Sequence, residues 1–222
     1  MNQASANLNI MIKAARRASR GLLRDFGEIE NLQVSSKAAG DFVSKADIKA
    51  EEIIYEELHE ARPNYGWLGE ESEEKKGRDP TRRWIVDPLD GTSNFLHGIP
   101  HWAISIGLEY KKEIIAGVIY DPIKDEMFTA EKGQGAWLND RRLRVSDRTN
   151  MLEMLFATGM PFGTKEGLQI TLEELEKLMP RCAGVRRHGA AALDLAYVAA
   201  GRLDGYWERG LKAWDIAAGL LI

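Results

Sequence analysis

The stretch WIVDPLDGT, residues 84–92, is the part of the sequence that decides the fold and indicates the chemistry. Its apolar start is typical of a short buried strand. Two aspartates, Asp87 and Asp90, follow that strand at once, with Pro88 between them. Because proline fixes φ and lacks an N–H, we expect a sharp turn there, with both carboxylates facing one point. The Leu89 carbonyl would then be free to act as a third oxygen ligand.

The end of this stretch predicts an anion site beside the two aspartates. Gly91 and Thr92 lie where a short helix is expected to begin. N–H groups at the start of a helix attract anions such as phosphate. Taken alone, Asp-Pro and Asp-Gly are ordinary turn pairs, so the interpretation depends on further acids converging on the same place.

Two further acids occupy comparable positions. Glu70 comes directly after a short apolar strand at 65–68, and Asp215 opens a helix after a turn at 210–212. Converging carboxylates repel one another and raise each other's pKa values unless hard cations neutralise them. The donors are oxygens only, without cysteine or clustered histidine, which favours Mg²⁺ over zinc. The sequence therefore predicts a magnesium site.

The histidines are not expected to bind a metal. His97 and His101 are spaced i, i+4, but Pro100 breaks any helix between them, and the chain has no HExxH pattern. The same expectation holds for His59 and His188.

Composition excludes several classes of protein. The 222 residues are 44% hydrophobic and 29% charged with a net charge of −4, which is typical of a globular protein and gives no bulk attraction for nucleic acid. The single cysteine, Cys182, excludes an internal disulfide. No apolar run is long enough to span a membrane or serve as a secretory segment. We read the basic, acid-poor residues 1–24 as a surface helix and expect a cytoplasmic protein.

Periodicity predicts an α+β fold, while length alone leaves either one larger domain or two tightly joined halves open; only the family resemblance described below implies a single domain, 1–222. Its first part, about 1–148, would be α+β, with helices at about 5–26 and 47–61, a charged loop at 73–83 and a β-meander from about 102. Its second part, about 149–222, would be α/β and share an interface with the first. The expected elements there are strands at 156–158, 184–186 and 203–208 and helices at 169–179, 189–200 and from 214.

Three segments resemble the signatures of the inositol monophosphatase family: 69–72, 84–95 and 214–219. The resemblance covers nearly the whole chain, including 41–47 and 189–208, and the bacterial inositol-1-monophosphatase branch fits best. It implies a layered αβαβα sandwich, usually a homodimer, that hydrolyses phosphate monoesters with Mg²⁺ and is inhibited by Li⁺. The substrate it implies is myo-inositol 1-phosphate, hydrolysed by water that two or three Mg²⁺ ions activate.

The resemblance also assigns roles to residues by their position in the motifs. The metal ligands would be Glu70, Asp87, the Leu89 carbonyl, Asp90 and Asp215, and Glu70 would also count among the catalytic residues. Asp47 and Thr92 would orient the attacking water. Phosphate would bind the N–H groups of Gly91 and Thr92, and the inositol hydroxyls would meet Asp90, Ala191 and Glu208.

The sequence departs from the family pattern at three places. Ala190 stands where many relatives have Ser or Thr, which removes a hydroxyl near the substrate. Lys37 is offset by about one residue from the family's loop lysine, so we assign it no role. The family's domain continues beyond the helix at 214–219, so we expect that the C-terminal end is missing after Ile222.

Two other functions remain open at this point. One is a sister phosphatase that acts on fructose 1,6-bisphosphate, a 3′-phosphoadenosine nucleotide or histidinol phosphate, since the metal motif does not separate these substrates. The other is a protein that binds transcription machinery and has secondary phosphatase activity. Its contact surface would be the N-terminal helix or a basic strip of four arginines, namely Arg141, Arg142, Arg144 and Arg148.

Overall fold

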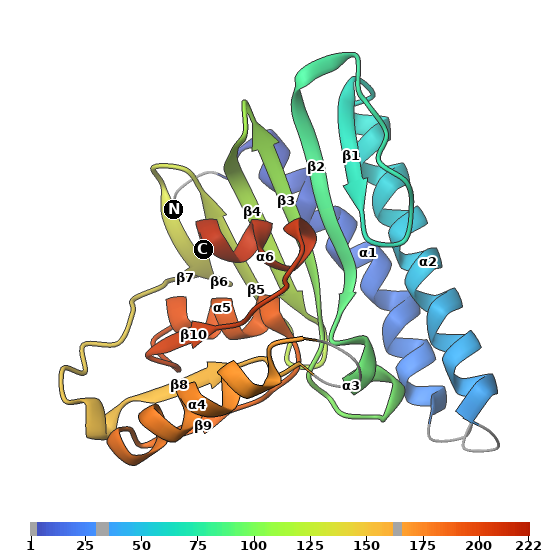
Figure 1. Cartoon of the computed structure of the whole chain (residues 1–222). Coiled ribbons are helices and arrows are strands. Elements are labelled where there is room, and N and C mark those ends of the chain that lie inside the picture. The colour runs from blue at the N-terminus through green and yellow to red at the C-terminus, as the bar shows by residue number, and fades with distance from the viewer. Residues whose placement is uncertain (1–3, 30–35, 162–165) are drawn as a thin grey trace.

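The chain folds into alternating layers of helix and sheet (Figure 1). The computed structural model describes the backbone of residues 4–29, 36–161 and 166–222, and their side chains except at 36–44. The elements of the first part are α1 (Ala6–Ile29), α2 (Ser36–Ala61), β1 (Tyr65–Gly69), β2 (Asp79–Asp90), α3 (Thr92–Leu96), β3 (Ala103–Tyr110), β4 (Glu113–Asp121), β5 (Glu126–Glu131), β6 (Gly135–Leu138) and β7 (Arg141–Arg142). Those of the second part are η1 (Met151–Glu153), β8 (Leu155–Thr158), α4 (Leu168–Leu178), η2 (Met179–Arg181), β9 (Gly184–Arg186), α5 (Ala191–Ala199), β10 (Gly205–Trp207) and α6 (Ala213–Leu221).

Two sheets of different size make up the β layers. The larger sheet has the order β1-β2-β3-β4-β5-β6-β7, in which β1 and β2 run parallel and each later strand is antiparallel to the one before it. The smaller sheet has the order β10-β8-β9 and is entirely parallel. Helices α1 and α2 cover one face of the large sheet, α5 and α6 lie between the sheets, and α4 covers the small sheet (Figure 1). This arrangement is the expected αβαβα sandwich.

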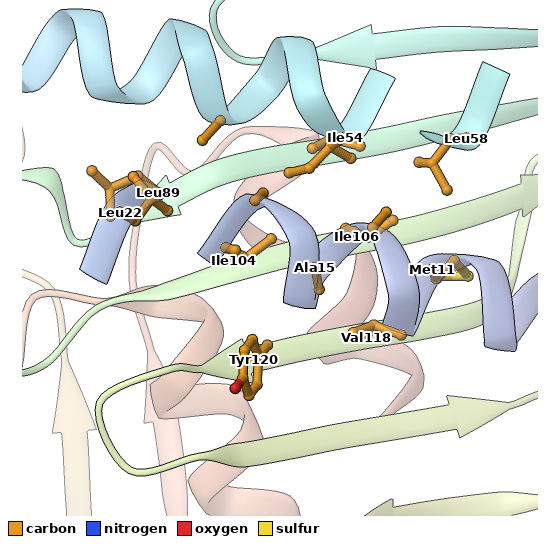
Figure 2. Packing of buried hydrophobic residues seen from close by; sticks show 14 of the residues in the cluster. Met11, Ala15, Leu22, Ile54, Leu58, Leu89, Ile104, Ile106, Val118 and Tyr120 are labelled. Carbon is orange, nitrogen blue, oxygen red and sulfur yellow. The ribbon is translucent and has the colours of Figure 1, made fainter. Parts of the chain in front are cut away.

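Alternation along the central strands builds two cores. Ile104 and Ile106 of β3 face the helices α1 and α2, where they meet Met11, Leu22 and Ile54 (Figure 2). The neighbouring residues of β3 point to the opposite face of the sheet, because successive side chains in a strand alternate. Ala103 accordingly packs in the second core, with α5 and α6. Both faces of the sheet are therefore buried, as an inner layer requires.

Small residues allow α6 to lie close to the large sheet. Gly107 and Gly117 are cross-strand partners on β3 and β4. A Cβ on Gly107 would lie 2.9 Å from the Cβ of Ala217, and a Cβ on Gly117 would lie 2.9 Å from the Ala218 carbonyl oxygen. Helix α6 can thus approach the sheet only where the strands carry glycine. This contact fixes the position of α6, and with it the position of Asp215 in its first turn.

The basic N-terminal helix belongs to the fold. Lys13 and Arg17 of α1 both form ion pairs with Glu57 of α2, the first at 2.7 Å. The opposite face of α1 is buried against the sheet. This confirms the reading of the acid-poor segment as a helix of the domain. Among the described helices none is both long and apolar enough to cross a membrane.

Two expected boundaries were wrong. Helix α2 begins at Ser36, well before the expected start at 47, so Ser44 lies within the helix rather than capping it. The segment contains helix-forming Ala38 and Ala39 and no proline, and its single glycine, Gly40, weakens the helix without ending it.

Strand β2 is longer than the apolar triplet predicted. It begins at Asp79, inside the stretch expected to be a loop, because it pairs with β1 on one side and β3 on the other. Arg83 lies opposite Glu109 in the ladder, and its guanidinium binds both oxygens of that carboxylate at 3.1 Å. Charged residues are stable in a strand when they pair across it. Local sequence alone did not reveal the partner.

We expect Ile54→Ala to lower the free energy of unfolding by about 2–5 kcal/mol, because Ile54 is fully buried between α2 and the sheet. Ile48→Ala on the same helix is the matched control: Ile48 is 42% exposed, and its change should cost at most about 1 kcal/mol. Urea unfolding followed by circular dichroism measures both variants. Equal losses would contradict the assignment of the buried face of α2.

Candidate active site

The two aspartates of the central motif lie at the end of β2, where the strand departs from regular pairing. The register with β3 shifts between Asp87 and Asp90, so the strand bulges there and continues to Asp90, without the sharp turn expected at Pro88. The Leu89 N–H donates to Asp87 Oδ1 at 2.9 Å. The Leu89 side chain is fully buried in the core formed with α1 and α2. The bulge thus anchors one side chain in the core and turns the carboxylates away from it.

Asp90 joins the large sheet to helix α5. Its carboxylate accepts the N–H groups of Ala191 at 3.1 Å and Ala192 at 2.7 Å, in the first turn of that helix. The N-cap residue, Ala190, makes no side-chain hydrogen bond to these N–H groups, so Asp90 of β2 caps helix α5 instead. Burial nonetheless raises the pKa of Asp90 to about 8, against the lowering effect of these hydrogen bonds.

Gly91 lets the chain leave β2 and begin α3. Its φ of +93° is in the left-handed region that favours glycine. A Cβ there would lie 3.0 Å from the His101 carbonyl oxygen and 3.3 Å from the Ala190 Cβ. The short helix α3 starts at Thr92, as the sequence predicted. Binding of phosphate by the N–H groups of Gly91 and Thr92 stays a prediction.

Helix α2 supplies Asp47 to the same place. Asp47 is buried, and its Oδ1 atom has no hydrogen-bond partner among the described residues. Burial raises the pKa of Asp47 to about 8, helped by the charges of Glu71, Glu70 and Glu51 and opposed by a hydrogen bond with Thr92. The Thr92 hydroxyl also lies 3.0 Å from the Leu89 carbonyl oxygen. A buried, unpartnered carboxylate oxygen points to a missing proton, water or cation.

Glu51 is a buried acid that the sequence analysis missed. It lies one helical turn after Asp47 on α2, and its Oε2 accepts the Glu71 N–H at 2.8 Å. A Cβ on Gly69 would lie 2.5 Å from both Glu51 carboxylate oxygens, so the glycine makes room for this acid. The i, i+4 spacing of Asp47 and Glu51 was the available signal, because it puts both on one face of the helix.

Glu70 and Asp215 complete the group. Burial raises the pKa of Glu70, a hydrogen bond with Asp87 lowers it, and the charge of Asp215 raises it again. Burial, followed by the charges of Asp90 and Glu70, raises the pKa of Asp87 well above its usual range. Asp215 also raises the pKa of Asp90, and its Oδ2 accepts the Lys212 N–H at 2.6 Å. The predicted acids therefore converge from β1, β2, α2 and α6.

Glu208 follows β10, the edge strand of the small sheet. The Tyr206 hydroxyl donates to Glu208 Oε2 at 2.5 Å. Gly159 leaves room for the Glu208 carboxylate, which would collide with any Cβ at that position. Burial raises the pKa of Tyr206, and its hydrogen bond with Glu208 and the charges of Glu208, Asp194 and Asp90 raise it further.

The donor set fits a hard divalent cation. Buried acids with raised pKa values, two of them sharing a hydrogen bond, need protons or cations between them. The donors are carboxylates and the Leu89 carbonyl, the ligands that Mg²⁺ prefers. Within the described chain no three of these acids bring oxygens within 4.8 Å of one another. Water or phosphate oxygens would therefore have to complete the coordination.

Of the four arginines proposed as a basic contact strip, Arg148 forms an ion pair within the fold. Arg148 binds Asp204 at 3.0 and 3.2 Å, and Asp204 in turn accepts the Leu155 N–H at 2.7 Å. Arg141 and Arg142 form the exposed edge strand β7. Lys37 and residues 41–44, which the sequence analysis singled out, lie outside the described side chains.

This layered fold, with acids gathered where β1 and β2 end and α6 begins, defines a class of protein: a phosphoric monoester hydrolase. The chain belongs to the inositol monophosphatase family, whose sequence profile matches residues 4–222. The inositol-1-monophosphatase of Rhizobium meliloti (strain 1021) is 58% identical over 218 residues, which cover 98% of this chain and 82% of that protein.

Two further relatives carry another name. The Nus factor SuhB of Pseudomonas aeruginosa is 45% identical over 219 residues, covering 97% of this chain and 81% of that protein. The crystal structure of extragenic suppressor protein suhB from Bartonella henselae is similar to this fold with a TM-score of 0.90, at 58% identity. That match covers 98% of this chain and 83% of the other.

The raised pKa values predict how stability depends on pH. Asp47 and Asp90 hold protons in the folded chain up to about pH 8 but lose them near pH 4 when unfolded. The folded state binds more protons between these values, so stability falls as pH rises. In EDTA we expect a loss of about 1 kcal/mol or more per pH unit between about pH 5 and pH 8.

Mg²⁺ should remove much of this slope, because a cation replaces the protons. Thermal unfolding at several pH values, with EDTA and with Mg²⁺, measures the difference. A melting temperature in EDTA that does not fall over this range, or no selective gain from Mg²⁺ at high pH, would contradict the account.

Proposed function

We propose that the protein hydrolyses phosphate monoesters with Mg²⁺ as cofactor, and that its substrate is myo-inositol 1-phosphate. The observation that carries this proposal is the convergence of four acids on one place. Burial raises the pKa values of Glu70, Asp87 and Asp90, and the charge of Asp215 helps to raise those of Glu70 and Asp90. A phosphate dianion cannot approach such a group unless cations neutralise it. Membership of the inositol monophosphatase family supports the same reaction.

The acids and the Leu89 carbonyl would hold two or three Mg²⁺ ions. When bound, the ions supply charge neutralisation and lower the pKa of water at the site. Glu70, Asp87, Leu89, Asp90 and Asp215 are the proposed ligands. Their positions rest on strand ends and a helix start, which are rigid supports for such a site.

Asp47 and Thr92 are the proposed pair that orients the attacking water. The Thr92 hydroxyl is hydrogen-bonded to the buried Asp47 carboxylate. A hydroxyl that donates its proton to a carboxylate presents its own lone pairs to a water molecule. The water would donate to Thr92 and keep a lone pair for the phosphorus, and Asp47 would take up the proton.

Recognition of the inositol part of the substrate would depend on Asp90, Ala191 and Glu208. Tyr206 holds the Glu208 carboxylate in place by its hydrogen bond. The small side chains of Ala190 and Ala191 leave no hydroxyl of their own to bind the sugar. Fructose 1,6-bisphosphate, a 3′-phosphoadenosine nucleotide and histidinol phosphate remain alternative substrates for a site built this way.

Four further properties stay predictions. A homodimer, inhibition by Li⁺ and a cytoplasmic location follow from the sequence resemblance and composition. A single domain over 1–222 is supported by the packing of α5 against strands of both sheets and of α6 against the large sheet.

A second candidate function is contact with transcription machinery. A relative at 45% identity is named Nus factor SuhB, and Arg141 and Arg142 lie exposed on β7. A pull-down with the double change Arg141→Ala and Arg142→Ala, compared with Asp90→Asn, would separate this function from hydrolysis. Binding that survives Asp90→Asn but is lost with the arginines would support a contact role, and unchanged binding in both would exclude this surface.

We expect Asp47→Asn to lower kcat by about 10²–10⁴-fold, because the amide cannot take up the proton of the attacking water. The fold should persist, since a buried amide costs less than a buried charge. Asp140→Asn, on an exposed turn, is the matched control and should keep full activity. Measurement of phosphate release tests both, and an active Asp47→Asn enzyme would remove Asp47 from the reaction.

A substrate panel tests the proposed specificity. With Mg²⁺, kcat/KM for myo-inositol 1-phosphate should exceed the values for the three alternative substrates, and Li⁺ should reduce the rate. A higher kcat/KM for one of the others would reassign the substrate. Release of phosphate from none of them would overturn the proposed function.

A further inference from the structure

We propose that His101, His188 and Asp194 form a second metal site, suited to a transition-metal ion such as zinc and separate from the carboxylate site. One ligand atom of each residue lies within 4.8 Å of the others. His101 lies just before β3, His188 lies just before α5, and Asp194 lies in the first turn of α5. The sequence predicted no metal at these histidines, because His101 and His188 lie far apart along the chain.

Asn94 fixes the spacing of the two histidines. This buried residue of α3 donates from its Nδ2 to the carbonyl oxygen of His101 at 2.7 Å and to that of His188 at 2.8 Å. The backbone segments that carry both rings are therefore tied to the same amide. Hydrogen bonds that hold ligand segments in place are a regular feature of metal sites.

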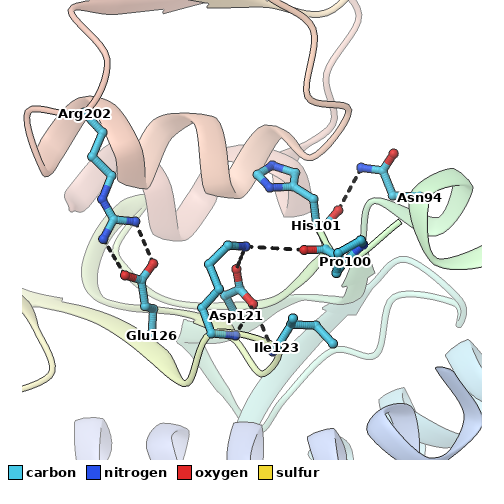
Figure 3. A network of polar contacts seen from close by, with 8 residues as sticks. Asn94, Pro100, His101, Asp121, Ile123, Glu126 and Arg202 are labelled. Carbon is cyan, nitrogen blue, oxygen red and sulfur yellow. Dashed lines mark hydrogen bonds and ion pairs between the residues drawn. The ribbon is translucent and has the colours of Figure 1, made fainter. Parts of the chain in front are cut away.

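His101 offers a buried nitrogen without a partner. Its Nε2 atom is inaccessible to solvent and has no hydrogen-bond partner among the described residues. Its ring points from the loop toward helix α5 (Figure 3) and packs at 5.0 Å from the ring of His188. Burial, with the charges of Lys124 and His188, lowers the pKa of His101 to about 4. The ring is neutral at neutral pH and can donate a lone pair to a metal.

Asp194 and His188 form a carboxylate–histidine pair. Asp194 Oδ1 lies 2.5 Å from His188 Nδ1, and the carboxylate is buried. In metal sites such a carboxylate either binds the ion or holds the histidine in the tautomer that does. Either arrangement leaves the pair able to contribute to a site with His101.

The donor atoms, rather than the surrounding charges, select the kind of ion. Lys124 lies near His101, but it is paired with the buried Asp121 at 2.5 Å and also reaches the Pro100 carbonyl oxygen at 3.4 Å (Figure 3). Burial raises the pKa of Asp194, while its hydrogen bond with His188 and the charge of Arg187 act in the opposite direction. Nearby positive charges disfavour every divalent cation, so the donor atoms decide which ion the site can hold. Imidazole donors favour zinc, cobalt, nickel or copper.

The distances require only a modest rearrangement, in which His101 would move closer and the pair of His188 Nδ1 and Asp194 Oδ1, now 2.5 Å apart, would open. Ligands of a tetrahedral zinc ion with bonds of about 2.0–2.1 Å lie about 3.3–3.5 Å apart. The donor atoms here lie within 4.8 Å of one another. Side-chain rotations of about an ångström would complete three ligands, with the fourth position left for water.

Titration of the Mg²⁺-saturated full chain with Co²⁺ tests the site, because cobalt reports its ligand geometry by visible absorption. We expect one equivalent to bind with the strong absorption of a four- or five-coordinate site, where an octahedral oxygen site absorbs weakly. Zn²⁺ should displace it. His101→Gln and His188→Gln should each weaken Co²⁺ binding by at least about tenfold.

Two variants control this experiment. His97→Gln removes an exposed histidine whose Nδ1 contacts the Ser93 carbonyl oxygen, and it should bind Co²⁺ like the parent. Asp87→Asn alters the carboxylate site and should also leave the cobalt spectrum unchanged. Co²⁺ binding that survives both His101→Gln and His188→Gln would overturn the proposal, and so would binding that is lost only in Asp87→Asn.

A second measurement does not depend on any variant. Proton NMR of the Co²⁺-loaded parent should show two strongly shifted, exchangeable imidazole N–H signals, one for each ligand histidine. Their absence, or the absence of Co²⁺ binding by the parent in the presence of Mg²⁺, would leave His101, His188 and Asp194 as a hydrogen-bonded cluster and contradict the proposal.

Discussion

The burial of several acids that also repel one another is the constraint on which this structure depends. Asp47, Glu70, Asp87 and Asp90 all have raised pKa values, and burial is the largest cause for each. The fold meets part of this cost with backbone N–H groups: two from α5 hold Asp90, and one from Leu89 holds Asp87. The rest must come from protons or cations. The arrangement of the chain thus requires either bound protons or divalent cations at these acids.

The packing of the layers holds these acids close together in spite of their repulsion. Leu89 is buried beneath α1 and α2, while the aspartates on either side of it belong to the site. Gly107 and Gly117 allow α6 to lie against the sheet and bring Asp215 to the other acids. The same residues that stabilise the sandwich therefore position the carboxylates.

Much of this arrangement was predictable because the signals are local. Asp87 and Asp90 follow an apolar strand, Gly91 precedes a short helix, and alternating apolar residues mark the central strands. The layered fold and the convergence of the main acids followed from these patterns and the resemblance that they carry. The early start of α2 was not predictable from these local signals, because Ser44 resembles a helix cap and Gly40 weakens helix propensity before it.

Other features depend on contacts between distant segments. The first residues of β2 are charged and become strand only through pairing with β1 and β3. Glu51 is recognisable as a site residue only once Gly69 and Glu71 lie beside it. His101 and His188 come together through Asn94, and no spacing along the chain indicates this.

Anomalous X-ray scattering from crystals soaked in Mn²⁺, a substitute for Mg²⁺ at oxygen sites, tests the central claim most directly. The account predicts strong anomalous peaks among Glu70, Asp87, Asp90 and Asp215, and their loss in Asp87→Asn crystals. Crystals saturated with Mn²⁺ that show no peak at these carboxylates would contradict it.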